Sequence, residues 1–351
     1  MNQRAPVPLP PLERLLESAT GTPPPLEFEE ILGGASVRRF FRVKTRDGGS
    51  AIAMYVPAQS HEIAKPSPVP RSWPFLEVRA LLEERGIRVP LLLGADCAQG
   101  FVLVEDLGET LAQHLTKAPE DRDELYVLAV RGLSRAQTSL WPLPAGSVVL
   151  ERAFDEELLL REVEHFREWA LEARGVHLSA EDRLTFERAA EHLSRTIAGW
   201  PRVFVHRDYQ SRNLMVVRDA HGKLGLGWVD FQDAMLGPRV YDLVALLSDS
   251  YQTFSRAFVE ARLDDFGHDQ GLSAQERAKL GREFRLVTVQ RKLKDAGRFV
   301  FIERTHGNPT FLPFVPGTIQ KAQAALDELA DDPILAELGR LIERLFPRQL
   351  S

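Results

Sequence analysis

The chain has 351 residues, 44% of them hydrophobic and 27% charged, so it is long enough to form two lobes with a substantial apolar core. Its 44 Lys and Arg residues against 50 Asp and Glu residues give a net charge of −6, which argues against a nucleic-acid-binding surface. A single cysteine, Cys97, excludes an intrachain disulfide and a cysteine-based zinc site. Because no signal-peptide core or apolar run of membrane-spanning length occurs, we expect a cytoplasmic protein without a membrane partner.

The first hundred residues are expected to form a small sheet with one main helix. Alternating apolar positions predict the strands, and apolar residues at helical spacing predict the helices. In chain order the expected elements are a short helix over Leu12–Ala19, strands over Phe28–Leu32, Arg39–Lys44 and Ser50–Val56, a helix over Phe75–Arg85, and strands over Val89–Leu93 and Gly100–Val104.

The remainder of the chain is expected to be mainly helical. The segment Glu105–Gly108 indicates a crossing between lobes, so we place the boundary there, with one lobe at 1–107 and the other at 108–351. Expected helices cover Thr110–Leu115, Pro119–Ser139, Phe154–Ala173, Ala180–Ala198, a helix from Gly237 through Tyr251, a long helix within Ser273–Phe301, and two closing helices within Thr318–Phe346.

One stretch between these helices, residues 203–247, is different in character. An apolar strand end at Val203–Val205 stops at His206, and two further short strands, Leu214–Val217 and Leu224–Val229, follow. The second of these strands delivers Asp230. Two acidic groups and one amide, Asp208, Asn213 and Asp230, are therefore expected at the ends of short adjacent strands, where their side chains can be aimed at one point.

This set of side chains fits phosphoryl transfer from a nucleotide. Asp208 is placed to orient an acceptor hydroxyl and take its proton, while Asn213 and Asp230 offer the oxygen ligands that Mg²⁺ prefers. The order His-Arg-Asp, four residues, Asn matches the catalytic-loop signature of kinases, and Asp230-Phe231-Gln232 stands where their metal-binding Asp-Phe-Gly occurs. Each piece alone is common by chance, but all of them in order, in a strand–loop–hairpin context, predict a kinase-type site.

The N-terminal strands supply candidate nucleotide contacts. The turn of Gly33, Gly34 and Ser36 would let backbone N–H groups approach phosphates, although many such turns are only turns. The third strand has no lysine where kinases pair one with the phosphates, so Arg38, Arg39 and Arg42 on the preceding strand are the candidate cations, although each could instead lie on a solvated strand face. The backbone of the crossing at Glu105 and Leu107 would hydrogen-bond an adenine edge.

Candidate acceptor contacts lie on the helices. Glu162 and Trp169 could hold a sugar ring and its hydroxyls, although packing for Trp169 and solvent exposure for Glu162 are open alternatives. Arg291 would suit an anionic substrate, or would be an ordinary surface cation. Asp242 is expected to accept hydrogen bonds from the backbone of the catalytic loop, which is a structural role.

With these residues in hand, the chain resembles the aminoglycoside phosphotransferase-like kinases over nearly its whole length. Within them it is most similar to the bacterial kinases that phosphorylate the anomeric C1 hydroxyl of N-acetylmuramate and N-acetylglucosamine in cell-wall recycling. The resemblance is carried by the segments Arg38–Val43, the Ala53-Met54 strand without Lys, Leu103–Gly108, Val205–Val216, Val229–Pro238 followed by Tyr241-Asp242-Leu243, and Gln290–Lys294.

The resemblance implies an α+β, bilobal, protein-kinase-like fold, with a small antiparallel sheet lobe and one main helix above a larger, mostly helical lobe. It implies ATP and Mg²⁺ between the lobes, Asp208 as the base, and Asn213 and Asp230 as metal ligands. The nucleotide contacts then implied are Gly33, Gly34, Ser36, Arg38, Met54, Glu105, Leu107 and Met215, with Met215 under the adenine. The implied contacts to a small amino-sugar substrate are Glu162, Trp169, Arg207, Gln210, Gln232 and Arg291.

Two alternatives stay open at the level of the sequence. The acceptor could be an aminoglycoside, choline or another small alcohol, and the acidic residues between Asp155 and Glu168 are compatible with a polycation. The chain could also be a nucleotide-binding scaffold without transfer activity, which the missing strand lysine favours and the intact Asp208, Asn213 and Asp230 oppose.

Overall fold

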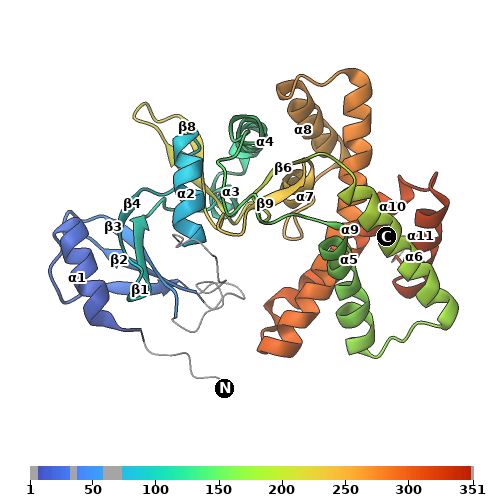
Figure 1. Ribbon diagram of the computed structural model, residues 1–351, viewed down its shortest axis with the longest axis horizontal. Helices are drawn as coiled ribbons and strands as arrows, with labels where there is room; N and C mark the ends of the chain where they lie inside the picture. Colours follow the sequence, from blue (N-terminus) through green and yellow to red (C-terminus); the bar gives the residue numbers. More distant parts are fainter. Residues whose placement is uncertain (1–6, 32–37, 58–72, 349–351) are drawn as a thin grey trace.

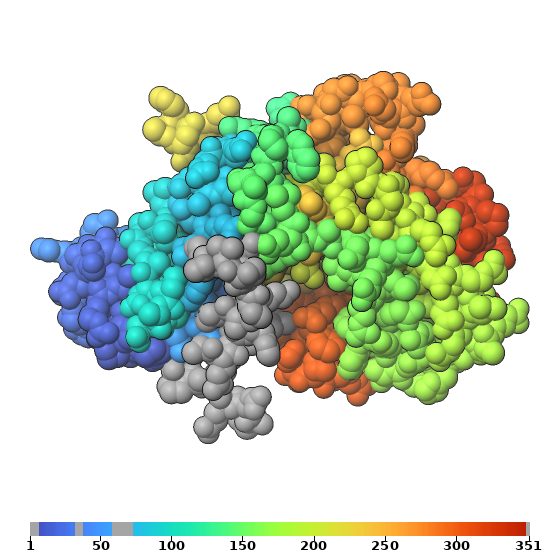
Figure 2. Space-filling model, viewed as in Figure 1, coloured from blue at the N-terminus to red at the C-terminus, as the bar shows by residue number. Residues whose placement is uncertain are grey.

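A computed structural model describes residues 7–31, 38–57 and 73–348. A small antiparallel sheet with its helices forms the N-terminal part, and most of the later chain is helical (Figure 1). In Figure 2 the blue to cyan segments lie on the left and most of the green to red segments lie on the right, whereas a yellow segment projects above the blue to cyan part. The expected α+β architecture is therefore confirmed.

The N-terminal sheet is antiparallel throughout, with strand order β1-β2-β3-β5-β4. Its strands are β1 (Phe28–Ile31), β2 (Arg39–Lys44), β3 (Ser50–Tyr55), β4 (Leu92–Asp96) and β5 (Phe101–Glu105). Side chains alternate across it: Ala51 and Ala53 face a cluster with helix α1 (Leu9–Thr20), while Met54 and Val56 pack with residues that include Phe75 of α2 (Pro74–Glu84). Both faces of the sheet are thereby covered.

Strand β4 begins later than the sequence pattern predicted. The expected strand started at Val89, whereas the observed strand starts at Leu92. Pro90 has no N–H to donate to a ladder, and the N–H of Leu91 is bound by the Glu105 side chain at 3.0 Å. The segment before Leu92 consequently runs outside the regular pairing.

The second part contains helices α3 to α11 and four short strands. The helices are α3 (Leu111–Lys117), α4 (Arg122–Ser139), α5 (Glu156–His165), α6 (Ala180–Ala198), α7 (Tyr241–Leu247), α8 (Arg256–Asp269), α9 (Ala274–His306), α10 (Val315–Asp327) and α11 (Pro333–Leu345). Several begin at serine, threonine or aspartate caps, such as Ser273, whose side chain accepts the N–H of Glu276. Among the described helices, none combines the length and apolarity needed to cross a membrane.

The helix expected over Phe154–Ala173 is interrupted. After α5 the chain forms one π-helical turn, Phe166–Leu171, before a short 3₁₀ turn. Gly297 of α9 packs directly on this break: a Cβ at Gly297 would lie 2.3 Å from the carbonyl oxygen of His165. The close approach of α9, which runs beside α5 in Figure 1, explains why an uninterrupted α-helix is absent here.

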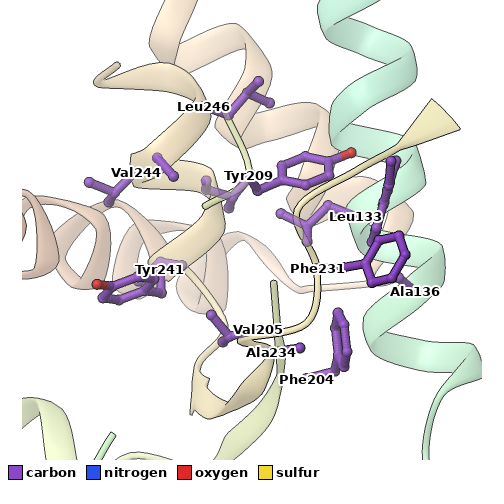
Figure 3. Packing of buried hydrophobic residues seen from close by; sticks show 14 of the residues in the cluster. Leu133, Ala136, Phe204, Val205, Tyr209, Phe231, Ala234, Tyr241, Val244 and Leu246 are labelled. Carbon is purple, nitrogen blue, oxygen red and sulfur yellow. The ribbon is translucent and has the colours of Figure 1, made fainter. Parts of the chain in front are cut away.

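Two short strand pairs position the central stretch. Strand β6 (Arg202–Val205) pairs with β9 (Met235–Pro238), and β7 (Leu214–Arg218) pairs with β8 (Leu224–Trp228). Strand β9 was not expected, because the sequence was interpreted as a helix from Gly237 through Tyr251; Gly237 and Pro238 instead end β9, and the helix spans only Tyr241–Leu247. The loops that join these strands rest on a packed apolar core, in which Tyr209 and Phe231 are fully buried near Leu133 and Ala136 of α4 (Figure 3). The loops are thus held on rigid supports.

Candidate active site

The loop that leaves β6 at His206 is fixed from below by a buried carboxylate. Asp242, at the start of α7 and fully buried, accepts the backbone N–H groups of His206 at 2.6 Å and Arg207 at 2.9 Å. Arg207 has φ +81°, a left-handed conformation that costs free energy in a residue other than glycine. The role expected for Asp242 is confirmed, since its two hydrogen bonds hold the strained backbone that precedes Asp208.

The uncharged imidazole ring of His206 supports the same loop. It is fully buried, its Nε2 lies 3.1 Å from the carbonyl oxygen of Val229, and its ring packs on Tyr209 and Trp228. Burial lowers the pKa of His206 to about 4, so the ring is uncharged at neutral pH and Nε2–H donates to Val229. This hydrogen bond ties the catalytic loop to the strand end that carries Asp230.

The carboxyl group of Asp208 faces the cavity and is held by Arg291. The buried guanidinium of Arg291 donates to the carbonyl oxygen of Arg207 at 2.8 Å and lies 3.4 Å from Asp208 Oδ1. Although burial opposes ionisation, Arg291, Lys294 and Arg207 hold the pKa of Asp208 below its usual value. Asp208 is therefore ionised at neutral pH, as a proton acceptor must be.

Asn213 and Asp230 meet on the other side of the loop. Asn213 Nδ2 donates to the carbonyl oxygen of Asp208 at 2.9 Å and lies 3.4 Å from Asp230 Oδ2. Asp230 has φ +64°, and its Oδ1 accepts the side-chain amide of Gln232 at 2.9 Å. Burial and the neighbouring charge of Asp208 raise the pKa of Asp230, whereas Arg38 opposes this change. The structure thus brings the three predicted chemical residues, Asp208, Asn213 and Asp230, to one place.

This arrangement fits a magnesium ion held jointly with phosphates. Because the amide nitrogen of Asn213 is used within the loop, its Oδ1 is left without a hydrogen bond from the described residues. One carboxylate and one amide oxygen match the sparse protein ligation of Mg²⁺ in nucleotide sites. The described part of the chain holds no group of three His, Cys, Asp or Glu side chains able to cage a metal ion.

A cavity of about 800 Å³ opens in front of Asp208. Its walls come from α5, the catalytic loop, the segment after α7, and the C-terminal half of α9. Its described lining contains seven basic and six acidic side chains, which are Arg161, Arg207, Arg212, Arg291, Lys292, Lys294 and Arg298 against Glu162, Asp208, Asp230, Asp233, Asp249 and Asp295. Three of the acids, Asp208, Asp230 and Asp233, and two of the bases, Arg207 and Arg212, belong to the catalytic segment itself, which leaves five basic and three acidic side chains on the far wall.

The predicted acceptor residues are distributed unevenly around this cavity. Glu162, Arg207 and Gln210 line it, but the Glu162 carboxylate is largely buried, where it accepts Gln290 Nε2 at 3.0 Å and lies 3.8 Å from Arg207. Trp169 is not among the lining residues: it packs edge-on against Phe301, with ring centroids 4.9 Å apart. Packing, the alternative left open for Trp169, is what the structure shows.

Arg291 and Gln232 take roles closer to the catalytic loop than to a substrate. Arg291 lines the cavity, but its guanidinium already contacts the carbonyl oxygen of Arg207 and the carboxylate of Asp208, so it is not a surface cation. Gln232 does not line the main cavity. Its amide bridges Asp230 at 2.9 Å and Asp233 at 3.1 Å, and it faces a smaller pocket of about 60 Å³ that Arg38 and Met54 also line.

The predicted nucleotide residues that the structure describes lie in or next to the sheet, in the crossing after β5, and on β7. Arg38 extends from the start of β2, with Nη2 3.8 Å from Asp230 and 3.6 Å from Asp233. Met54 is buried in β3, the strand that has no lysine. Gly33, Gly34 and Ser36 lie outside the described residues, and the structure says nothing about their turn.

The crossing between the two parts has a free backbone edge. The Glu105 side chain is engaged with Arg88 at 2.5 Å and with the N–H of Leu91, so it is not available to a nucleotide. Within the described chain, neither the N–H nor the C=O of Leu107 forms a hydrogen bond. Met215 lies on β7, where it pairs with Gly227 of β8. It also forms an isolated β-bridge with Thr110, shortly after the crossing.

Sequence reasoning missed much of the basic wall. Lys294, Asp295 and Arg298 line the cavity along with Arg291, at positions i, i+3, i+4 and i+7 of α9. Such spacing places side chains on one face of a helix. A run of charged residues on one face of a long helix was therefore the signal that could have marked them, but a solvent-exposed face gives the same pattern.

A small antiparallel sheet above a helical part, with Asp208, Asn213 and Asp230 converging beside it, defines the class of kinase-type phosphotransferases. The sequence matches the family described as "Phosphotransferase enzyme family" over residues 27–280, more than half of the chain. The chain belongs to this family.

Comparison with curated proteins shows similarity to a more specific group of kinases. The chain is 32% identical over 338 residues to an N-acetylmuramate/N-acetylglucosamine kinase of Pseudomonas aeruginosa, an alignment that covers 95% of this chain and 93% of the relative. It is 31% identical to the protein of the same name from Neisseria meningitidis, with 88% of each chain covered. These similarities extend through the sheet, the catalytic loop and the C-terminal helices.

Solved structures show the same fold in more distant proteins. A microcompartment-associated aminopropanol kinase superimposes with a TM-score of 0.63 at 15% identity, covering 93% of this chain and 99% of the other. An ADP-bound aminoglycoside phosphotransferase gives 0.56 at 14% identity, covering 84% and 92%. The expected protein-kinase-like fold is thereby confirmed.

Proposed function

We propose that this protein is an ATP- and Mg²⁺-dependent kinase that phosphorylates the anomeric C1 hydroxyl of N-acetylmuramate and N-acetylglucosamine, in the cytoplasmic recycling of cell-wall sugars. The observation that carries the proposal is the carboxylate of Asp208, with a lowered pKa, on the wall of a cavity of about 800 Å³, beside Asn213 and Asp230. Relatives that share the name of such a kinase cover about nine-tenths of the chain, which supports the choice of acceptor.

In the proposed reaction Asp208 orients the acceptor hydroxyl and accepts its proton late in the transfer. Because an anomeric hydroxyl is more acidic than an ordinary alcohol, positioning and charge neutralisation contribute most of the acceleration. Asn213 and Asp230 would hold Mg²⁺, which when bound offsets the charge of the triphosphate. Arg291 keeps Asp208 ionised and aimed into the cavity.

We propose that the nucleotide binds between an N-terminal lobe, 1–107, and a C-terminal lobe, 108–351. The free backbone edge of Leu107 would bind the adenine, and Met215 would contact its ring. Arg38 is proposed to supply the cation that the missing strand lysine would give, since its guanidinium already lies beside Asp230 and Asp233. Gly33, Gly34 and Ser36 remain the proposed phosphate-binding turn.

The charge of the cavity weighs against a polycationic acceptor. An aminoglycoside needs carboxylates that are free to receive it. Here the far wall is basic, and the Glu162 carboxylate is already hydrogen-bonded. The intact set of Asp208, Asn213 and Asp230 likewise opposes a scaffold without transfer activity.

The test offers a panel of acceptors to the protein and identifies each product by its mass. Purified protein with ATP and Mg²⁺ is offered both amino sugars, choline, ethanolamine and kanamycin, and phosphorylated products are analysed by ³¹P NMR. We expect a sugar phosphate coupled to the anomeric proton and labile in mild acid. A 6-phosphate, or transfer to the amines with neither sugar modified, would contradict the proposal, and an Asp208→Asn variant controls for contaminating kinases.

A further inference from the structure

One cation in the acceptor cavity has no counter-ion. Arg298 on α9 is half-buried, lines the cavity, and forms no hydrogen bond or ion pair with any residue in the described part of the chain. Its guanidinium carbon lies 4.8 Å from the ring centroid of Phe301, which holds the side chain against the wall. Burial and the neighbouring charge of Arg207 lower the pKa of Arg298, whereas the charge of Asp208 opposes this change without forming an ion pair with it.

The other half-buried or buried cations of this wall have partners, and so does the exposed Arg161. Arg161 donates to Glu168 at 2.9 Å, and Lys294 lies 3.3 Å from Asp295. Arg212, which also lacks an ion pair among the described residues, is exposed and stacks on Tyr251 at 3.5 Å. Arg298 is thus a half-buried guanidinium without an ion-pair partner among the described residues. Partial desolvation of an unpaired cation costs free energy, which binding of an anionic ligand would offset.

Its position along α9 separates Arg298 from the reacting end of the cavity. Arg291, which contacts Asp208, lies seven residues earlier, so Arg298 is two turns or about 10 Å further along the helix axis. A sugar whose C1 hydroxyl faces Asp208 would therefore direct a substituent on the far side of its ring toward Arg298. Lys294 lies between them on the same face and adds positive charge.

We propose that Arg298, assisted by Lys294, binds the carboxylate of the lactyl ether on C3 of N-acetylmuramate and makes this protein prefer that acid to N-acetylglucosamine. The inference rests on the proposed function and adds to it the residue that discriminates between the two sugars. N-acetylglucosamine has a hydroxyl at C3 and offers no charge to Arg298. A guanidinium suits a carboxylate because its parallel N–H groups match the two oxygens.

The experiment compares three acceptors with four proteins. Specificity constants, kcat/KM, are measured for N-acetylmuramate, its uncharged methyl ester and N-acetylglucosamine. The proteins are the wild type, Arg298→Met, which keeps an apolar stem against Phe301, Arg298→Lys, and Arg304→Met. Arg304 is the matched control, because it lies on the same helix but is exposed and paired with Glu303 at 3.1 Å. Circular dichroism and ADP affinity verify that each variant is folded.

The expected readout is a ratio. For the wild type, N-acetylmuramate exceeds its methyl ester by roughly 10- to 100-fold in kcat/KM, the size of a charge-assisted hydrogen bond, mainly through KM. Arg298→Met removes that ratio, Arg298→Lys restores part of it, and Arg304→Met leaves it unchanged. The thermodynamic cycle of residue and ester isolates the contact from general effects on activity.

Two results would overturn the inference. If Arg298→Met keeps the wild-type preference for the free acid, the carboxylate binds elsewhere. If it lowers kcat/KM for all three acceptors equally, Arg298 contacts a phosphate or supports the fold. In both cases the sugars are still phosphorylated and the proposed function stands, whereas a wild type that phosphorylates neither sugar refutes the proposed function itself.

Discussion

Asp242 is the buried group on which the geometry of the catalytic loop depends most directly, so Asp242→Asn is the most informative perturbation. The carboxylate accepts two backbone N–H groups, from His206 at 2.6 Å and Arg207 at 2.9 Å. An asparagine keeps the shape but has one acceptor oxygen, and its NH₂ group must face the other N–H donor. The substitution therefore removes one charge-assisted hydrogen bond and leaves a buried donor unsatisfied.

The expected loss of stability follows from these contacts. A hydrogen bond to a charged group contributes about 1.5–3 kcal/mol, and an unsatisfied buried donor costs about 1–3 kcal/mol, so we expect a destabilisation of about 2.5–6 kcal/mol. The left-handed backbone of Arg207, which costs about 1–3 kcal/mol, is then no longer held in place. As Arg207 relaxes, Asp208 moves with it, and turnover falls by at least tenfold while the KM for nucleotide changes little.

Urea denaturation and steady-state kinetics measure both effects, at about pH 8, above the pKa of about 7 to which burial raises Asp242. Asp123→Asn, at an exposed position in the first turn of α4, is the control and is expected to stay within about 0.5 kcal/mol of the wild type. A stable Asp242→Asn protein with normal turnover would refute the view that this carboxylate holds the catalytic loop.

Three further predictions concern the chemical residues. Asp208→Asn should leave nucleotide binding intact and lower turnover by ~10²–10⁴-fold, and near-normal turnover would remove Asp208 from the role of base. Asp230→Ala should abolish Mg²⁺-dependent nucleotide binding in titration calorimetry, and equal affinity with and without Mg²⁺ in the wild type would argue against a metal at this position. Because the pKa of Asp230 is raised and that of Asp208 is lowered, acidification should protonate Asp230 first. The acid limb of the pH profile should then appear in the KM for nucleotide before it appears in kcat.

Local signals were sufficient where the chemistry and the secondary structure come from contiguous residues. The helix over Ala180–Ala198 was predicted with both ends correct, because its apolar spacing lies within the segment. The convergence of Asp208, Asn213 and Asp230 was predicted for the same reason, since each follows or precedes a short strand. The roles of individual nucleotide contacts stay predictions, and three of them lie outside the described residues.

Features that depend on a distant partner were not predictable. The π-helical turn after α5 exists because Gly297 of α9 packs on His165, more than a hundred residues away in sequence. Arg291 was expected at the cavity mouth, but its burial became visible only when α9 was placed behind the catalytic loop. Trp169 was a candidate for sugar stacking, and only the position of Phe301 shows that its ring is used for packing. Sequence spacing states which residues share a helical face, but not what that face contacts.

The backbone itself marks where function is concentrated. Among the described residues other than glycine, only Arg207 and Asp230 have positive φ angles, and each adjoins or supplies a chemical group of the site. Such conformations cost about 1–3 kcal/mol each and persist only where surrounding contacts determine them. Here Asp242 binds the N–H of Arg207, and Gln232 binds the carboxylate of Asp230. The strain is thus retained where two strand ends must turn side chains toward one point, which ordinary strand geometry would direct apart.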